Sequence, residues 1–138
     1  MAGKIVADQI EGTTTTETVG GASVTIPNSI DTKYVVNGSA KAWANINGTA
    51  ATPVFRDSFN CSSLTDNTGG DYAPQLTNAM SNGNFSQVAS AHHNGVSYSA
   101  SPYTGGKTAN QMALTCGKIN GSAADAEIID TSAHGDLA

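Results

Sequence analysis

Short runs of alternating apolar and polar residues, separated by turn signals, predict that most of the chain after residue 21 forms β-strands. The runs are rich in Val, Tyr, Phe and Thr, which favour strands, and none has the period of a helix longer than one turn. The turn signals include five Asn-Gly pairs, which favour tight hairpins. The pattern therefore predicts an all-β, antiparallel fold. The expected strands span residues 22–26, 33–36, 40–46, 54–64, 71–76, 85–93, 95–100, 108–116 and 126–131.

The lone tryptophan lies in a strand whose two faces differ. In residues 40–46, small residues and Ile46 share one face, whereas Lys41, Trp43 and Asn45 share the other. Trp43 is therefore expected to point toward the more polar side of its strand. Three interpretations stay open: packing in a second buried layer, an exposed platform for a ligand, or a contact between subunits.

The two cysteines are predicted to point inward, because alternation places each of them on an apolar face. Two cysteines are too few for a disulfide scaffold, and they lack the C-x-x-C spacing of zinc and redox sites. Two thiols that pack as small apolar residues are the favoured interpretation, and one disulfide bridge is the alternative. The two faces consist of Phe55, Phe59 and Cys61, and of Met112, Leu114 and Cys116.

The first 21 residues differ in pattern from the rest of the chain. A short mixed segment, KIVADQI, is followed by EGTTTTETVGG, which has neither a helical period nor a stripe of apolar residues. This pattern predicts an arm and linker over residues 1–21 and one folded domain over residues 22–138. The arm is either a frayed terminus or an extended segment that docks on a larger assembly.

Composition narrows the classes of partner. Charged residues make up 12% of the 138 residues, and the formal net charge is −5 with only six Lys and Arg. Phosphate binding needs clustered basic residues, so we expect no nucleic-acid partner. The chain has no run of 18 apolar residues and no apolar secretion signal, so we expect synthesis in the cytoplasm and no membrane insertion. Large aliphatic residues are scarce, which favours burial of strand faces between copies of the chain.

No motif predicts a catalytic, cofactor or metal site, and we expect a protein that is not an enzyme. The sequence TGGKT ends like a phosphate-binding loop, but Ser101 stands where that motif requires glycine. His92 and His93 are adjacent on a strand and point to opposite faces, so a regular strand does not present both to one ion. Three alternatives stay open: an ion held by one of these histidines with His134 and an aspartate, an ion held by histidines around a threefold axis, and calcium held by loop carboxylates.

Several short motifs occur together between residues 34 and 91. They are NGSAKAW followed by N-x-N-G-T, then RDSFN, the sequence SSLTDN leading into GDY, and NAM followed by a turn and an aromatic residue. In this combination they resemble a module of fibre-like and spike-like virion proteins of tailed phages, many of them from marine hosts. The opening KIVADQIEG is also similar to the start of small phage fibre proteins, whose first residues lie against the virion.

The resemblance implies a homotrimer with an N-terminal attachment arm and an antiparallel β-sandwich or jelly-roll-like knob. It implies a non-enzymatic protein of the virion surface, a short trimeric tail fibre or spike that contacts a host-surface ligand. The alternative is a head-decoration or head-fibre protein bound to the capsid through its arm. Pro74 interrupts an expected strand, which favours an edge position for that strand. Attachment to other virion proteins is expected through Lys4, Ile5, Val6 and Ile10.

Contact with a ligand or with another subunit is expected through three aromatic residues and one histidine. A host-surface glycan suits this set, because an aromatic ring offers a stacking face while the abundant Asn, Ser and Thr supply hydrogen bonds. The residues are Trp43, Tyr98, Tyr103 and His92.

Overall fold

The computed structural model of the chain describes residues 15–19, 22–26, 35–36 and 38–138. The chain divides into two compact units, residues 1–36 and residues 37–138. The sequence placed the domain boundary earlier, after residue 21. The four residues expected to attach the chain to a virion, Lys4, Ile5, Val6 and Ile10, lie outside the described residues.

The described residues of the first unit include an antiparallel strand pair. Strand β1 (Thr15–Val19) pairs with β2 (Ala22–Ile26), so that Thr15 lies opposite Ile26 and Val19 lies opposite Ala22. The prediction of β2 is confirmed, whereas residues 15–19 form a strand where the sequence predicted a linker. The reason is that Thr and Val are β-branched, and such residues favour the extended backbone even without an apolar stripe.

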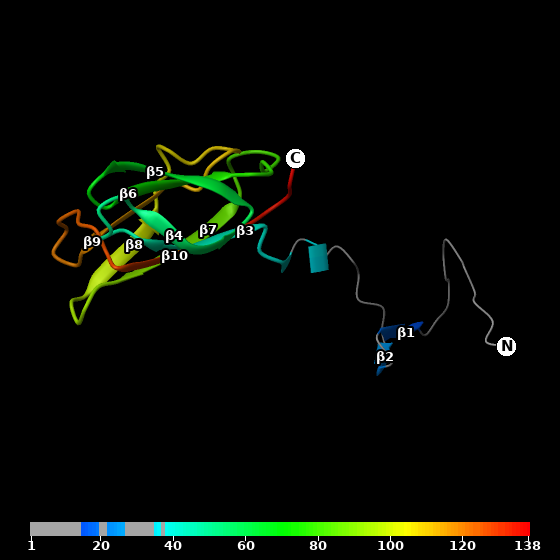
Figure 1. The fold of residues 1–138 in the computed structure, drawn as a ribbon. Coiled ribbons are helices and arrows are strands. Elements are labelled where there is room, and N and C mark those ends of the chain that lie inside the picture. The colour runs from blue at the N-terminus through cyan, green and yellow to red at the C-terminus, as the bar shows by residue number, and fades with distance from the viewer. Residues whose placement is uncertain (1–14, 20–21, 27–34, 37) are drawn as a thin grey trace. The chain divides into compact units, whose positions relative to one another are not determined.

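The second unit is an antiparallel β-sandwich, which confirms the all-β prediction. One sheet has the strand order β4-β3-β10-β7 and the other the order β5-β6-β9-β8, and Figure 1 shows them face to face. The jelly-roll part of the prediction is not confirmed. The strands are β3 (Ala42–Asn47), β4 (Val54–Phe59), β5 (Cys61–Thr68), β6 (Asp71–Leu76), β7 (Ser86–His92), β8 (Tyr98–Pro102), β9 (Leu114–Lys118) and β10 (Ile128–His134).

The core lies between the two sheets and consists of two clusters. The larger cluster is built on Ile46, Tyr72, Leu114 and Ile129, which come from both sheets and are fully buried. The second cluster extends the core toward the ends of the sheets, and its buried members are Ala42, Leu76, Met80, Phe85, Met112 and Ala133. Small residues on β3 and β10 let the sheets approach closely, so a sequence poor in large aliphatic residues still fills this space.

Asn60 marks the point where the chain leaves one sheet and enters the other. The sequence predicted one continuous strand over residues 54–64, but β4 ends at Phe59 and β5 begins at Cys61 in the opposite sheet. Asn60 has a positive φ of 56°. Asparagine tolerates this left-handed conformation better than other side-chain-bearing residues, so it accommodates the corner between the sheets.

Pro74 lies in an interior strand, so the prediction of an edge position is wrong. Strand β6 is flanked by β5 and β9. Its ladder with β9 ends at Tyr72, however, and beyond it Met112 N–H donates to Pro74 O at 2.9 Å. The N–H and C=O of a strand residue point to the same side, so the hydrogen that proline lacks would face a segment where the regular ladder has stopped.

Two other expected strands differ from the structure. Val35 and Val36 form a helical turn where a strand was expected, and residues 33 and 34 lie outside the described residues. Residues 108–113 precede β9 without joining it, and the isolated bridge between Gln75 and Gln111 holds them beside β6. Asn94 and Gly95 form a tight turn with positive φ at both positions, as the Asn-Gly pattern predicted. Within the described ranges, no helix has the length and apolar character needed to cross a bilayer.

Both cysteines are free, and both face the core as the alternation predicted. Cys116 is buried, and Cys61 is half-buried at the start of β5. Burial raises the pKa of Cys61 to about 11, and burial likewise raises the pKa of Cys116 to about 11. Both thiols therefore stay protonated in the folded protein at neutral pH.

Raising the pH above 9 is expected to lower the free energy of unfolding. A thiol in the unfolded chain ionises near its ordinary pKa of 9.0, whereas the folded thiols ionise near 11. The unfolded state therefore loses protons first, so this contribution to stability is complete below pH 9 and is lost as pH rises through about 11. Urea denaturation between pH 8 and pH 10 measures the effect. The double variant C61A/C116A should lose less stability over this range, and an equal loss would contradict the assignment to the thiols.

Candidate functional site

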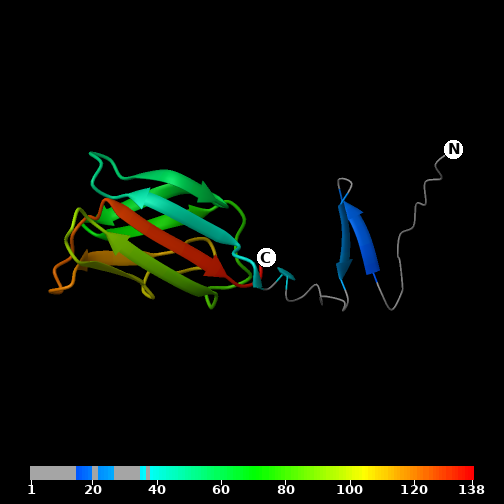
Figure 2. The ribbon, with the colours of Figure 1, turned by 90° about the horizontal axis from the view of Figure 1, so that it is seen from below.

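Three rows of side chains cross the strands on the solvent-facing side of the sheet β4-β3-β10-β7, hereafter the outer face, and the pair His134 and Ser86 lies beyond them on β10 and β7. Figure 2 looks onto this sheet, with β3 in cyan, β10 in red and β7 in yellow-green side by side. The strand registers define the rows. The aromatic row consists of Phe59, Trp43, Ser132 and Val88, and the acidic row consists of Asp57, Asn45, Asp130 and Ser90. The third row combines two registered pairs, Val54 with Asn47 and Ile128 with His92.

Phe59 reaches the outer face because of a β-bulge. The pairing of β3 with β4 places Asn45 opposite Asp57 and Ile46 opposite Phe55, so Arg56 is an extra residue in β4. An extra residue reverses the alternation of faces beyond it. Phe55 consequently packs against the core, while Phe59 is 54% exposed. The prediction that Phe55, Phe59 and Cys61 share one face is therefore wrong for Phe59.

The aromatic row brings three exposed apolar side chains together on the outer face. Trp43 is 37% exposed and lies directly opposite Phe59, and Val88 on β7 is 61% exposed. Strand β3 has neighbours on both sides, and its opposite face is buried through Ala42, Ala44 and Ile46. This backbone is fixed by ladders and by core packing, so the indole is presented from a rigid support.

The acidic row lies next to the aromatic row and carries two carboxylates around one amide. Asn45 Nδ2 donates a hydrogen bond of 2.6 Å to Asp130 Oδ1. The described residues provide no partner for Asp130 Oδ2 or for the hydroxyl of Ser90. Asp57 Oδ1 accepts a bond of 2.8 Å from the N–H of Ser58. The row therefore offers hydrogen-bond acceptors and hydroxyls to solvent.

A groove of about 330 Å³ lies over β10, between the indole of Trp43 and the side chain of Val88. Ser132 lies along its floor, and Asp130 and Ser90 line the end toward the acidic row. One side of the groove is thus aromatic and aliphatic, while the other carries a carboxylate and hydroxyls. Small ligand sites combine an apolar wall with a few convergent polar groups in this way.

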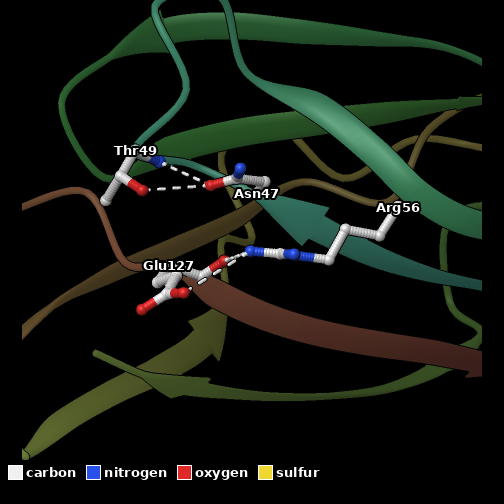
Figure 3. Close-up of polar contacts among 4 residues, drawn as sticks. All are labelled: Asn47, Thr49, Arg56 and Glu127. Atoms are coloured by element: carbon white, nitrogen blue, oxygen red, sulfur yellow. Dashed lines mark hydrogen bonds and ion pairs between the residues drawn. The ribbon is translucent and has the colours of Figure 1, made fainter. Parts of the chain in front are cut away.

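The third row ends beside a set of polar contacts at the turn after β3. Asn47 Oδ1 accepts hydrogen bonds from Thr49 N–H at 3.2 Å and from Thr49 Oγ1 at 3.0 Å (Figure 3). The bulge residue Arg56 reaches across to the residue before β10, where its Nη2 donates to Glu127 O at 3.1 Å and lies 3.9 Å from Glu127 Oε1. The bonds between Asn47 and Thr49 hold the turn in place. The bonds of Arg56 to Glu127 hold the bulge and use the guanidinium of Arg56.

The four residues proposed as ligand or subunit contacts do not form one site. Trp43 and His92 both lie on the outer face, two rows apart. Tyr98 lies on β8 in the other sheet and packs against the core, where its ring centroid is 5.4 Å from that of His93. Tyr103 is exposed in the segment after β8. Of the proposed set, only Trp43 lines the groove.

Four residues that surround Trp43 on the outer face were not predicted from the sequence. Alternation within residues 126–131 could have placed Asp130 on the face that Ile129 and Thr131 do not share. No local signal indicates that β10 pairs with β3, however, because Asn45 and Asp130 are 85 positions apart in the sequence. The position of Phe59 depends on a bulge that the sequence does not announce. The residues missed are Phe59, Val88, Ser90 and Asp130.

The fold and the outer face together define a class: an antiparallel β-sandwich that presents an exposed aromatic groove with acidic and hydroxyl groups along one side. No known protein family, curated protein or solved structure matches the chain. Among the described residues, no group of three or more His, Cys, Asp or Glu side chains is arranged to hold a metal ion.

Proposed function

We propose that the chain is a non-enzymatic protein of a phage virion surface, a short trimeric tail fibre or spike whose sandwich contacts a host-surface ligand. The motifs between residues 34 and 91 support the virion role. The observation that carries the contact role is the groove beside Trp43, because it places an exposed aromatic ring and free polar groups on a rigid sheet. The N-terminal arm, the jelly-roll-like connectivity and the threefold assembly belong to this proposal.

Counting copies of the chain in purified virions tests the proposal. A tail fibre or spike is expected in a small number of trimers that remain with isolated tails, measured by quantitative gel or mass spectrometry. Recovery in hundreds of copies on isolated heads would replace it with the head-decoration role. Absence from purified particles, in lysates where the chain is expressed, would contradict both roles.

A further inference from the structure

The groove beside Trp43 has the chemistry of a site for an uncharged sugar. A sugar ring has an apolar face of C–H groups and an edge of hydroxyls. Its binding site therefore needs a flat aromatic surface against the face and hydrogen-bond acceptors along the edge. Trp43 supplies the surface, and its rim position on the groove leaves the indole accessible. Val88 closes the opposite wall with a second apolar contact.

The polar end of the groove favours hydroxyl donors. Asp130 is held in place by the 2.6 Å bond from Asn45 Nδ2 to its Oδ1, which leaves Oδ2 to accept from a ligand. Ser90 and Ser132 line the same groove and can donate or accept. A carboxylate that accepts from a hydroxyl forms a charge-assisted hydrogen bond, which is stronger than a bond between neutral groups.

The charge of the outer face favours a neutral sugar over the other candidate ligands, an anionic sugar and a second copy of the chain. In the acidic row, Asp57 and Asp130 lie on either side of Asn45. The nearby Arg56 donates its hydrogen bond to Glu127 instead. An anionic sugar would place a further negative charge beside these carboxylates, which is unfavourable. A second copy docked over the row would have to cover two carboxylates, and burying an unpaired charge is costly. A neutral polyol satisfies the carboxylate without either cost.

We propose that the groove lined by Trp43, Val88 and Asp130 binds one uncharged sugar unit, stacked on the indole and hydrogen-bonded to the Asp130 carboxylate. The inference rests on the outer face being the contact surface of the proposed function, and it does not depend on the virion role. The volume of about 330 Å³ lies at the small end of the range for ligand pockets, which fits a single unit of a longer glycan.

Tryptophan fluorescence of the full chain tests the site directly, because Trp43 is the sole tryptophan. The probes are the methyl glycosides of glucose, galactose, mannose and N-acetylglucosamine, with glucuronic acid and N-acetylneuraminic acid as anionic comparisons. We expect a saturable change in the millimolar range with at least one neutral glycoside. We expect weaker binding or none with the acids.

Two variants and two controls assign the binding to these residues. D130N keeps the tryptophan and should weaken the binding about tenfold or more, the effect of losing a charge-assisted bond. W43A, followed by saturation-transfer NMR, should lose saturable binding. E127Q removes a carboxylate outside the groove and Y103A removes an exposed aromatic outside it, and both should bind within about twofold of the parent.

Three results would overturn the inference. They are no saturable response to any of the neutral glycosides, equal or tighter binding of the acids, and an assembly in sedimentation that W43A dissociates, which would make a second copy the occupant. These failures are separate from the virion test. A chain that is present on tails and binds none of the sugars refutes only the site, whereas a chain that binds a sugar and is absent from particles refutes only the virion role.

Discussion

Replacing Gly70 by alanine is expected to lower the free energy of unfolding by more than about 4 kcal/mol, an effect that few single substitutions reach. Gly70 lies in the turn between β5 and β6 with a φ of 80°, in the left-handed region. A Cβ there would lie 2.3 Å from Cys116 O and 2.9 Å from Ala124 N. Both atoms belong to the backbone, so no side-chain rotation relieves the clash.

Hydrogen bonds prevent the turn from moving away. Cys116 N–H donates to Gly70 O at 2.6 Å, and Gly70 N–H donates to Asp125 Oδ1 at 2.8 Å. The same Asp125 oxygen accepts a bond of 2.5 Å from the buried Tyr72 hydroxyl. Burial and the neighbouring carboxylate raise the pKa of Tyr72 well above its usual range, so this hydroxyl remains a donor. Displacing Gly70 would therefore break a network that joins three segments.

Gly95 provides the matched control. It also has a left-handed φ, of 74°, but a Cβ at this position meets nothing within 4 Å. G95A should therefore cost only the conformational strain, about 1–2 kcal/mol. Urea denaturation of both variants separates strain from steric clash. Similar stabilities for G70A and G95A would show that the turn absorbs the extra methyl group.

Replacing Asn60 by alanine is expected to cost about 2–4 kcal/mol, the second-largest effect, because it removes both a tolerated left-handed residue and a set of side-chain hydrogen bonds. Asn60 Nδ2 donates to Lys41 O at 3.0 Å and to Asn78 O at 3.1 Å. Its Oδ1 accepts from Asn78 N–H at 2.8 Å. The side chain thus ties the crossover between the sheets to the start of β3 and to the segment after β6.

N60G distinguishes the two contributions. Glycine adopts a φ of 56° without strain but makes none of the side-chain bonds, so N60G should recover about 1 kcal/mol relative to N60A and remain less stable than the parent. Thermal and urea denaturation measure this order. If N60G matched the parent in stability, the bonds to Lys41 and Asn78 would make no net contribution, and the crossover would depend on backbone conformation alone.

Local pattern predicted the strands well wherever one face is buried and the other is wet. The strand expected over residues 40–46 covers β3 except for its last residue, and the inward faces of β3 and β9 contain Ala44, Ile46, Leu114 and Cys116 as alternation required. These predictions succeed because a strand with two different faces fixes its own orientation.

The errors share a different cause. Phe59 changes face because of the extra residue Arg56, and Pro74 lies in an interior strand because the ladder beside it stops at Tyr72. Both depend on how one strand pairs with its neighbour, which the pattern of a single strand does not show. The same holds for the candidate site, where Trp43 was singled out by its strand pattern but Asp130 joins it only through the pairing of β3 with β10.

The bulge at Arg56 also affects the open side of its sheet. β4 is an edge strand, and an extra residue bends such an edge and interrupts its row of free N–H and C=O groups. β5, an edge of the other sheet, carries two register shifts, and the third edge, β8, ends at Pro102. Three of the four edges are thus poor templates for a strand from a neighbouring chain, which protects the sandwich against growth into an intermolecular ladder. The fourth edge, β7, continues through the turn at Asn94 and Gly95 toward β8 and lies beside that strand, so the same chain covers part of its open side.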